Sequence, residues 1–145
     1  MEILRATCSF LQNLKVNPKV GILTAVRKET YERKKNSDDF IQRELNKTYE
    51  DAEWLVQKLK EKYEVFNHEI EINTAVENGC NVILPINGIV GNQIFRVFFM
   101  CGYKNLFNPR IGLSRYYTEN TRNETDFTNH IRWLVAWISG FQVIK

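Results

Sequence analysis

Cysteine, histidine and proline are scarce in this chain of 145 residues, which contains three, two and three of them respectively. Three cysteines are an odd number and form no Cys-x-x-Cys pair, so the sequence encodes neither a disulfide framework nor a zinc knuckle. No apolar run approaches the roughly 18 to 20 residues that span a bilayer, and the first residues lack the basic and apolar regions of a signal peptide. We therefore expect a cytoplasmic protein with reduced cysteines, no membrane association, no metal and no cofactor.

A strong charge of one sign is also missing. The chain has 20 Lys and Arg against 17 Asp and Glu, a formal net charge of +3, whereas dedicated nucleic-acid-binding proteins have dense basic faces. Residues 27–35 are locally basic and include Tyr31, which would allow contacts with phosphate groups. Such a segment is more often a solvated loop, and nucleic-acid binding is therefore a disfavoured alternative.

Apolar and aromatic side chains are plentiful. Hydrophobic residues make up 43% of the chain, and nine Phe, six Tyr and three Trp are among them. A chain of this length and composition can bury one core of ordinary size. We therefore expect a single domain over residues 1–145.

Apolar residues recur at steps of three and four in three segments. This spacing predicts amphipathic helices over about residues 2–16, 37–63 and 125–140. The second helix would be roughly 40 Å long at 1.5 Å per residue, which is longer than a domain of this size requires. Part of it is therefore expected to face a partner.

Strands are predicted between and after these helices. The run from Lys19 to Val26 is apolar and rich in β-branched residues, which is typical of a buried strand. Alternation, or aromatic and β-branched content, predicts further strands over residues 68–73, 80–86, 93–101 and 110–117. This order predicts an α+β fold in which the long helix and the C-terminal helix pack on a mostly antiparallel sheet.

Residues 93–101 decide between this fold and an alternative. The segment contains no Ala, Leu or Glu and many aromatic and β-branched residues, which favours a strand. If residues 92–104 were helical instead, strands and helices would alternate along an open α/β sheet. Ligands of such sheets bind outside the carboxyl ends of the strands, which here are the surroundings of Arg27 and of Asn87–Asn92.

Five residues are candidates for binding. On a strand, Arg96 would be the only charge in its segment, and a neighbouring strand would offer Arg115 beside Tyr116 and Tyr117. The planar fork of arginine and the surface of an aromatic ring suit recognition of a carboxylate, a phosphate or a protein partner. Arg27 is the fifth candidate and belongs to the alternative fold.

No complete catalytic or metal-binding constellation is visible. Gly88–Gly91 follows an apolar strand and could cradle a phosphate through backbone N–H groups. A tight turn is the simpler interpretation, because Asn87 precedes the first glycine. His68 with Cys80 or Cys101 could form a nucleophilic dyad, but the sequence does not place these residues together. We assign no catalytic residue.

These observations favour a non-enzymatic protein-interaction module that self-associates as a homodimer or binds another protein through an aromatic-rich surface. The alternative is a small α/β domain, ligand-binding or enzymatic, for a phosphorylated or sugar-like molecule. A further alternative is a viral or mobile-element factor that blocks a host protein, with which the frequent asparagines and the lack of motifs are compatible.

Overall fold

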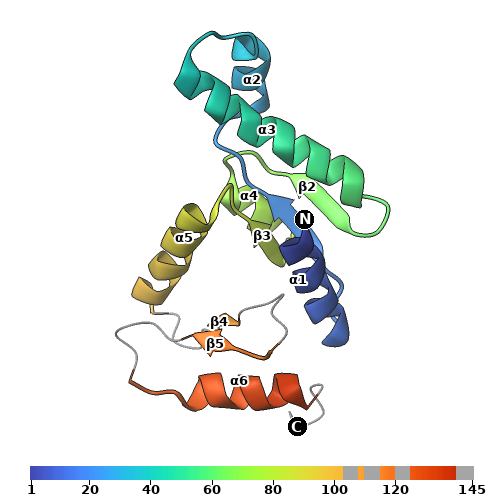
Figure 1. Ribbon diagram of the computed structural model, residues 1–145, viewed down its shortest axis with the longest axis vertical. Coiled ribbons are helices and arrows are strands. Elements are labelled where there is room, and N and C mark those ends of the chain that lie inside the picture. The colour runs from blue at the N-terminus through green and yellow to red at the C-terminus, as the bar shows by residue number, and fades with distance from the viewer. Residues whose placement is uncertain (103–107, 110–114, 120–124, 140–145) are drawn as a thin grey trace. The chain divides into compact units, whose positions relative to one another are not determined.

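The computed structural model describes residues 1–102, 108–109, 115–119 and 125–139 of the chain (Figure 1). Helices and short strands alternate through most of this part. The elements follow one another as α1 (Glu2–Asn13), β1 (Lys19–Ile22), α2 (Lys28–Lys34), α3 (Phe40–Leu59), β2 (Glu64–Asn67), α4 (Ile72–Glu77), β3 (Val82–Leu84), α5 (Gly88–Met100), β4 (Asn108–Pro109), β5 (Thr118–Glu119) and α6 (Thr128–Ile138).

The chain divides into two compact units. Asn17–Gln93 forms one of them, which we call the sheet unit, and Met1–Val16 with Ile94–Lys145 forms the other, which we call the terminal unit. The boundary between them falls within α5. Compact units need not fold independently, so the single domain expected over residues 1–145 stays a prediction.

The sheet unit is built around one parallel sheet, with its strands in the order β2-β1-β3. Val20 of β1 pairs with Val65 of β2 on one side and with Val82 of β3 on the other. Val20 and Ile22 are 0% and 3% exposed, so the central strand is covered on its apolar face and on both edges. Such a strand is expected to be a short apolar run, which Val20–Ile22 of β1 forms after Lys19.

The connections of this sheet explain where its helices lie. From β1 the chain passes through α2 and α3 to β2, and from β2 it returns through α4 to β3 on the far side of β1. Right-handed crossovers that run in opposite directions place α3 and α4 on opposite faces. At Gly21 of β1, an added Cβ would lie 3.0 Å from the Cβ of Ala75 in α4. Gly21 therefore lets α4 approach the strand closely.

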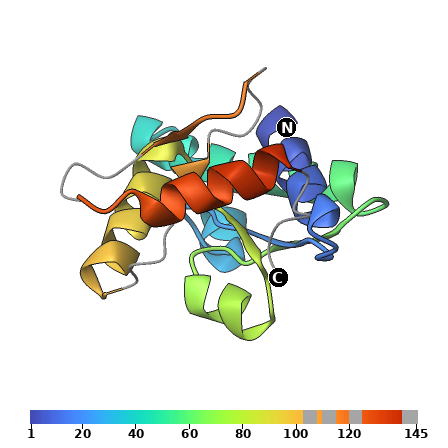
Figure 2. The same ribbon diagram turned by 90° about the horizontal axis from the view of Figure 1, so that it is seen from below.

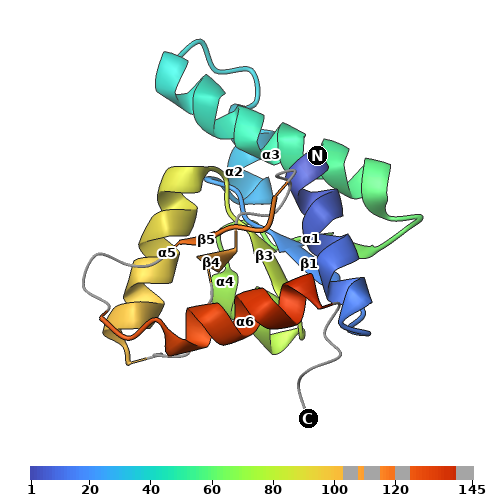
Figure 3. The same ribbon diagram turned by 60° about the horizontal axis from the view of Figure 1, so that its bottom comes forward.

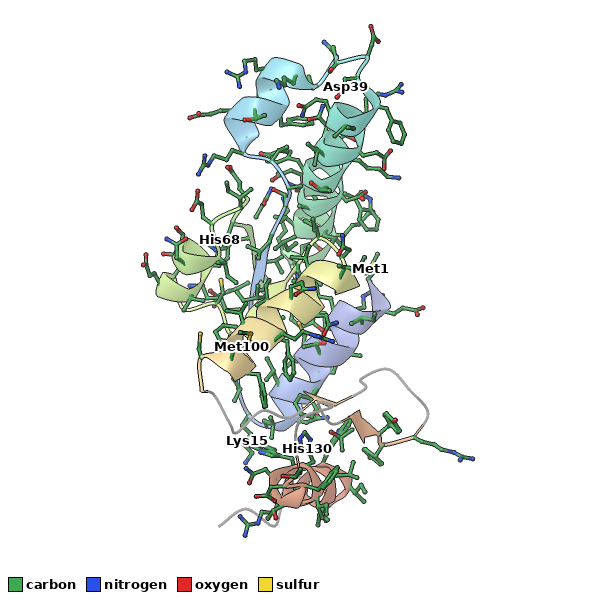
Figure 4. All side chains as sticks on the ribbon, turned by 90° about the vertical axis from the view of Figure 1, so that its left-hand side faces the viewer. Met1, Lys15, Asp39, His68, Met100 and His130 are labelled. Atoms are coloured by element: carbon green, nitrogen blue, oxygen red, sulfur yellow. The ribbon has the colours of Figure 1, made fainter. Side chains whose placement is uncertain are left out.

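Asp39 determines where α3 begins. Its side chain accepts a hydrogen bond of 2.8 Å from the backbone N–H of Gln42, as an N-cap residue does (Figure 4). Tyr49 and Leu59 lie on the buried face of the helix. The short helix α2 packs beside it, with the rings of Tyr31 and Tyr49 stacked 4.7 Å apart. The pair α2 and α3 is thus joined through aromatic contacts.

The terminal unit contains α1, the part of α5 from Ile94 onward, the strands β4 and β5, and α6. Asn108 of β4 and Glu119 of β5 pair in an antiparallel arrangement (Figure 3). Helix α6 runs without interruption (Figure 2). The ring of Trp137 in α6 packs edge-on against Phe10 of α1 at 5.4 Å and against Tyr116 at 5.0 Å. These aromatic contacts connect the first and last helices of the chain.

The prediction of an α+β fold with a mostly antiparallel sheet was wrong. The three strands of the main sheet are all parallel, and the open α/β alternative fits. The error arose at residues 93–101, which lie almost entirely in α5 rather than in a strand. Aromatic and β-branched residues are only weakly disfavoured in helices, so tertiary packing readily overrides that preference.

Other predicted elements differ in detail. Residues 68–73 form no strand, because β2 ends at Asn67 and Glu69 turns the chain with a φ of 56°. The predicted strand over residues 110–117 lies outside the described residues up to position 114, and positions 115–117 are not in a strand. The basic segment, expected to be a loop, contains the helix α2.

All three predicted helices are confirmed, with shorter bounds. The patterns near both ends and in the long central segment correspond to α1, α6 and α3. The predicted strands at β1 and β3 are also present. Among the described residues, no helix combines the length and the apolar character needed to cross a bilayer.

Candidate functional site

Three loops follow the strands of the sheet unit, and together we call them the carboxyl edge. They comprise residues 23–27 after β1, 68–71 after β2 and 85–87 after β3. Ligands of open α/β sheets bind at this edge, where the strand order reverses. Because β2 and β3 lie on opposite sides of β1, the reversal lies between β1 and β3. The candidate site is therefore the region between loops 23–27 and 85–87.

Hydrogen bonds fix the loop after β1. The N–H of Thr24 donates to the carbonyl of Glu69 at 2.7 Å, and the hydroxyl of Thr24 donates to the carbonyl of Val26 at 2.7 Å. The N–H of Ala25 donates to the hydroxyl of Thr48 in α3 at 2.9 Å. Thr24 is buried. The loops after β1 and β2 are thus joined to each other and to α3.

An ion pair joins the loop after β1 to the loop after β2. The Nη2 and Nε atoms of Arg27 donate to Oε1 of Glu71 at 2.6 and 3.2 Å. The hydrogen bond and the charge of Glu71 raise the pKa of Arg27. Both side chains are substantially exposed, so the pair adds little to stability. Its effect is to hold the guanidinium group of Arg27 at the carboxyl edge, beside the loop after β2.

The loop after β3 leads directly into α5. Asn87 accepts a hydrogen bond of 3.0 Å from the N–H of Val90 through its side chain and one of 3.1 Å from the N–H of Gly91 through its carbonyl. An added Cβ at Gly91 would lie 2.9 Å from Cγ of Pro85, whereas one at Gly88 would meet nothing within 4 Å. The tight turn expected at Asn87 was wrong. Asn87 instead caps a helix that begins at the carboxyl edge.

The structure brings together two residues that the sequence could not connect. The Sγ atom of Cys80 lies 3.5 Å from Nε2 of His68. Figure 4 shows His68 beside α4. Burial raises the pKa of the Cys80 thiol and lowers the pKa of His68, and the charge of Lys19 lowers both. At neutral pH the pair is therefore a thiol with an uncharged imidazole, and not a preformed thiolate nucleophile.

Four of the five predicted binding residues lie in the terminal unit, and only Arg27 lies in the sheet unit. Arg96 is on α5, so the sheet surface that it was expected to share with Arg115 does not exist. Tyr116 and Tyr117 precede β5, and each is about half exposed. The ring of Tyr116 already packs against Trp137. Their role in binding stays a prediction.

The second histidine is buried in the terminal unit. His130 of α6 is 4% exposed, and its Nδ1 lies 3.4 Å from the hydroxyl oxygen of Thr118 in β5 (Figure 4). This contact connects the helix to the strand and gives the ring a structural role. The described residues contain no group of three or more side chains suited to hold a metal ion.

Sequence reasoning missed Glu71 and the capping role of Asn87. Glu71 was not singled out because its partner Arg27 is far away in the sequence. An available signal for Asn87 was its position immediately before a long apolar segment, which is typical of an N-cap. The carboxyl edge itself was foreseen, but only under the alternative fold.

The chain is similar to a protein of Methanocaldococcus jannaschii that is described as an uncharacterized methyltransferase. The two are 27% identical over 140 residues, which cover 94% of this chain and 54% of the relative. The chain thus spans about half the length of the curated relative it matches. No family model matches the chain, and no solved structure matches it significantly.

This likeness bears on the predicted function. It contradicts the expected non-enzymatic, self-associating interaction module, because the relative is described as an enzyme. It agrees better with the alternative, an α/β domain with a ligand-binding or enzymatic role, and the parallel sheet fits the α/β fold of that alternative. The chain is thus similar to a methyltransferase in sequence and has an open α/β sheet in its sheet unit.

Proposed function

We propose that the sheet unit binds a small phosphorylated or sugar-like ligand, through an anionic group of that ligand, as part of an enzyme that transfers a chemical group. Methyl transfer is the specific candidate, because the matched relative is described as a methyltransferase. The observation that carries the proposal is the parallel β2-β1-β3 sheet, whose strand order reverses beside the loop that ends at Arg27. Binding sites of open α/β sheets lie at such reversals.

Arg27 is the residue that would bind the anionic group. Its guanidinium is held at the edge by Glu71 and has donors that the single contacted oxygen of Glu71 does not use. A planar guanidinium binds phosphate or carboxylate through two parallel hydrogen bonds. The beginning of α5 at the same edge adds the partial positive charge of a helix N-terminus. Both features favour a ligand with negative charge.

A methyl donor would have further requirements. S-adenosylmethionine, the commonest such donor, contains a nucleoside, and nucleoside-containing cofactors of open α/β sheets are bound by a glycine-rich first turn and by an acidic residue after a strand. The turn after β1 contains no glycine between Leu23 and Arg27, whereas Glu69 and Glu71 follow β2. The edge therefore matches only one of the two features. We assign no step of methyl transfer to a residue of this chain.

The proposal is tested by titrating the full chain with three probes, namely S-adenosylmethionine, ribose 5-phosphate and inorganic phosphate. Backbone amide chemical shifts would report the site of binding. We expect one probe to move the resonances of Thr24 and Gly88, which border the candidate site, and of Glu71, which is the partner of Arg27. If none of the three moves these resonances at millimolar concentration, the proposal is wrong.

Two variants separate specific binding from general charge effects. Arg27→Gln should weaken binding of the active probe by about tenfold or more, since a charged hydrogen-bonded pair is lost. Arg43→Gln removes the same charge from an exposed position on α3 and serves as the matched control. Equal weakening by both variants would indicate nonspecific attraction and would count against a site at the carboxyl edge.

A further inference from the structure

The pair formed by Cys80 and His68 lies outside the contacts proposed for the ligand. We propose that Cys80 is a site of covalent thiol modification by small disulfides and similar soft electrophiles, with His68 as the base that takes the thiol proton. The observation behind this proposal is the distance of 3.5 Å between Sγ of Cys80 and Nε2 of His68, which is a hydrogen-bonding distance for sulfur. This inference does not depend on the identity of the ligand at the carboxyl edge.

The fold brings these two side chains together across a glycine. His68 follows β2 and Cys80 precedes β3, so the central strand β1 lies between them. An added Cβ at Gly21 would lie 3.2 Å from Cδ2 of His68 and 3.3 Å from Sγ of Cys80. Any larger side chain at position 21 of β1 would therefore press on both His68 and Cys80. The lack of a side chain at Gly21 leaves the space in which the thiol and the imidazole meet.

The surroundings set the charge of both groups. Burial lowers the pKa of His68 below its ordinary value of 6.5, so the imidazole is uncharged at pH 7 and can accept a proton. Burial also raises the pKa of Cys80 above its ordinary value of 9.0. Two charged residues face the pair, Lys19 of β1 and Glu64 of β2, which lie 3.8 Å apart and have opposite effects on the thiol. A base within hydrogen-bonding distance is thus the main aid to ionisation.

The reaction with an aromatic disulfide is a simple exchange. The sulfur of Cys80 attacks one sulfur of the reagent, a new S–S bond forms, and the S–S bond of the reagent breaks to release an aromatic thiolate. The proton of Cys80 moves to Nε2 of His68 and then to water. The reagent is the oxidant, so no other reactant is required.

Modification would also disturb the carboxyl edge. The N–H of His68 donates to the carbonyl of Ile22, and the N–H of Glu71 donates to the carbonyl of His68, both at 2.9 Å. Because Cys80 is only 8% exposed, an added group must displace the imidazole ring beside it. We therefore expect the amide protons of His68 and Glu71 to exchange faster in the modified chain. Unchanged exchange at these amides after modification would contradict this part of the inference.

The test treats the folded full chain with an aromatic disulfide and follows each cysteine by peptide mass spectrometry. Cys8, which is 0% exposed, serves as the buried control, and Cys101 serves as the exposed reference. At pH 7 we expect Cys80 to react much faster than Cys8. In His68→Gln the rate at Cys80 should fall by at least about tenfold, because the general base is lost. A rate for Cys80 as low as that of Cys8 would overturn the proposal.

The variant also distinguishes a base from a packing residue. If His68 only packs against Cys80, then His68→Gln loosens the site and the thiol reacts at the same rate or faster, which would refute the proposal. If the variant does not fold, the pH profile of the native chain decides instead. With a base, the rate at Cys80 rises as His68 loses its proton below pH 7 and then levels off. A rate that only increases tenfold per pH unit up to the thiol pKa would exclude assistance by His68.

Discussion

Helix α6 of the terminal unit leaves more of its apolar side chains exposed than the core of the sheet unit does. In the sheet unit, Val20, Ile22 and Leu59 are at most 3% exposed. On α6 of the terminal unit, the residues that are most buried are His130 and Ala136. The apolar residues Phe127, Ile131, Val135 and Ile138, which share the other side of that helix, are each about half exposed or more.

The comparison shows what a periodic apolar pattern can predict. Helices α3 and α6 both repeat apolar residues at steps of three and four, and both form. In α3 the buried residues Tyr49, Ala52 and Leu59 belong to the predicted stripe. In α6 the buried side of the helix carries Trp137 rather than the stripe that contains Ile131. The pattern therefore predicts the helix but not the face that its neighbours cover.

The largest difference between the units should appear at Leu59. Leu59→Ala removes a side chain that is 2% exposed and should lower the free energy of unfolding of the sheet unit by about 3 kcal/mol, because a cavity is left in the core. Hydrogen exchange of the β1 amides at increasing urea concentration would measure this loss. A loss below about 0.5 kcal/mol, typical of an exposed site, would show that the two units are equally loosely packed.

A substitution at Gly21 tests the packing of the sheet unit in the opposite way, because it adds volume to the core instead of removing it. In Gly21→Val the added Cβ alone would lie 3.0 Å from Cβ of Ala75, and the two methyl groups would crowd the core further. Overpacking of this kind should lower the free energy of unfolding by about 2 kcal/mol. The same exchange measurement applies. Adding Ala75→Gly should recover part of the loss, whereas a strictly additive double variant would show that the two residues do not press on each other.

The elements that could be predicted depend on residues close together in the sequence, whereas the others depend on contacts between distant residues. The helices α1, α3 and α6 and the strand β1 depend on local spacing, which the sequence displays directly. Residues 93–101 were misassigned because their intrinsic preferences are weak and the packing around them decides. The strand predicted at 68–73 does not form because Glu69 has a positive φ. The side chain of Asn67 supports this conformation by accepting a hydrogen bond of 2.9 Å from the N–H of Glu69. That arrangement depends on one side-chain conformation, which periodicity does not reveal.

The candidate site was predictable only in part. Arg27 and the segment after β3 were foreseen as the carboxyl edge of an α/β sheet, because strand ends can be located from the sequence. The contact of Cys80 with His68 depends on the register in which Gly21 pairs with Phe66 and with Ile83. Nothing in local spacing determines such a register between parallel strands, so the pair was beyond sequence reasoning.

A smaller effect is expected at the beginning of α3, where the side chain of Asp39 stabilises only the first turn of the helix. Asp39→Ala removes the side chain that accepts a hydrogen bond from the N–H of Gln42 and should lower the free energy of unfolding by about 1 kcal/mol. Asp39→Asn retains an accepting oxygen and should cost much less. Urea unfolding followed by far-ultraviolet circular dichroism would compare the three chains, and equal stability of all three would contradict the assignment of Asp39 as the cap.

The smallest effect should occur on α6, where it completes the comparison. Ile131→Ala shortens an apolar side chain that is 59% exposed, so little buried area is lost, and alanine has the higher helix propensity. We expect a change of less than about 0.5 kcal/mol in the free energy of unfolding, measured through the exchange of the α6 amides. Ala136→Leu, on the buried side of the same helix, should be clearly destabilising. If Ile131→Ala costs as much as Leu59→Ala, the face that contains Ile131 is covered in solution, and the difference between the two units disappears.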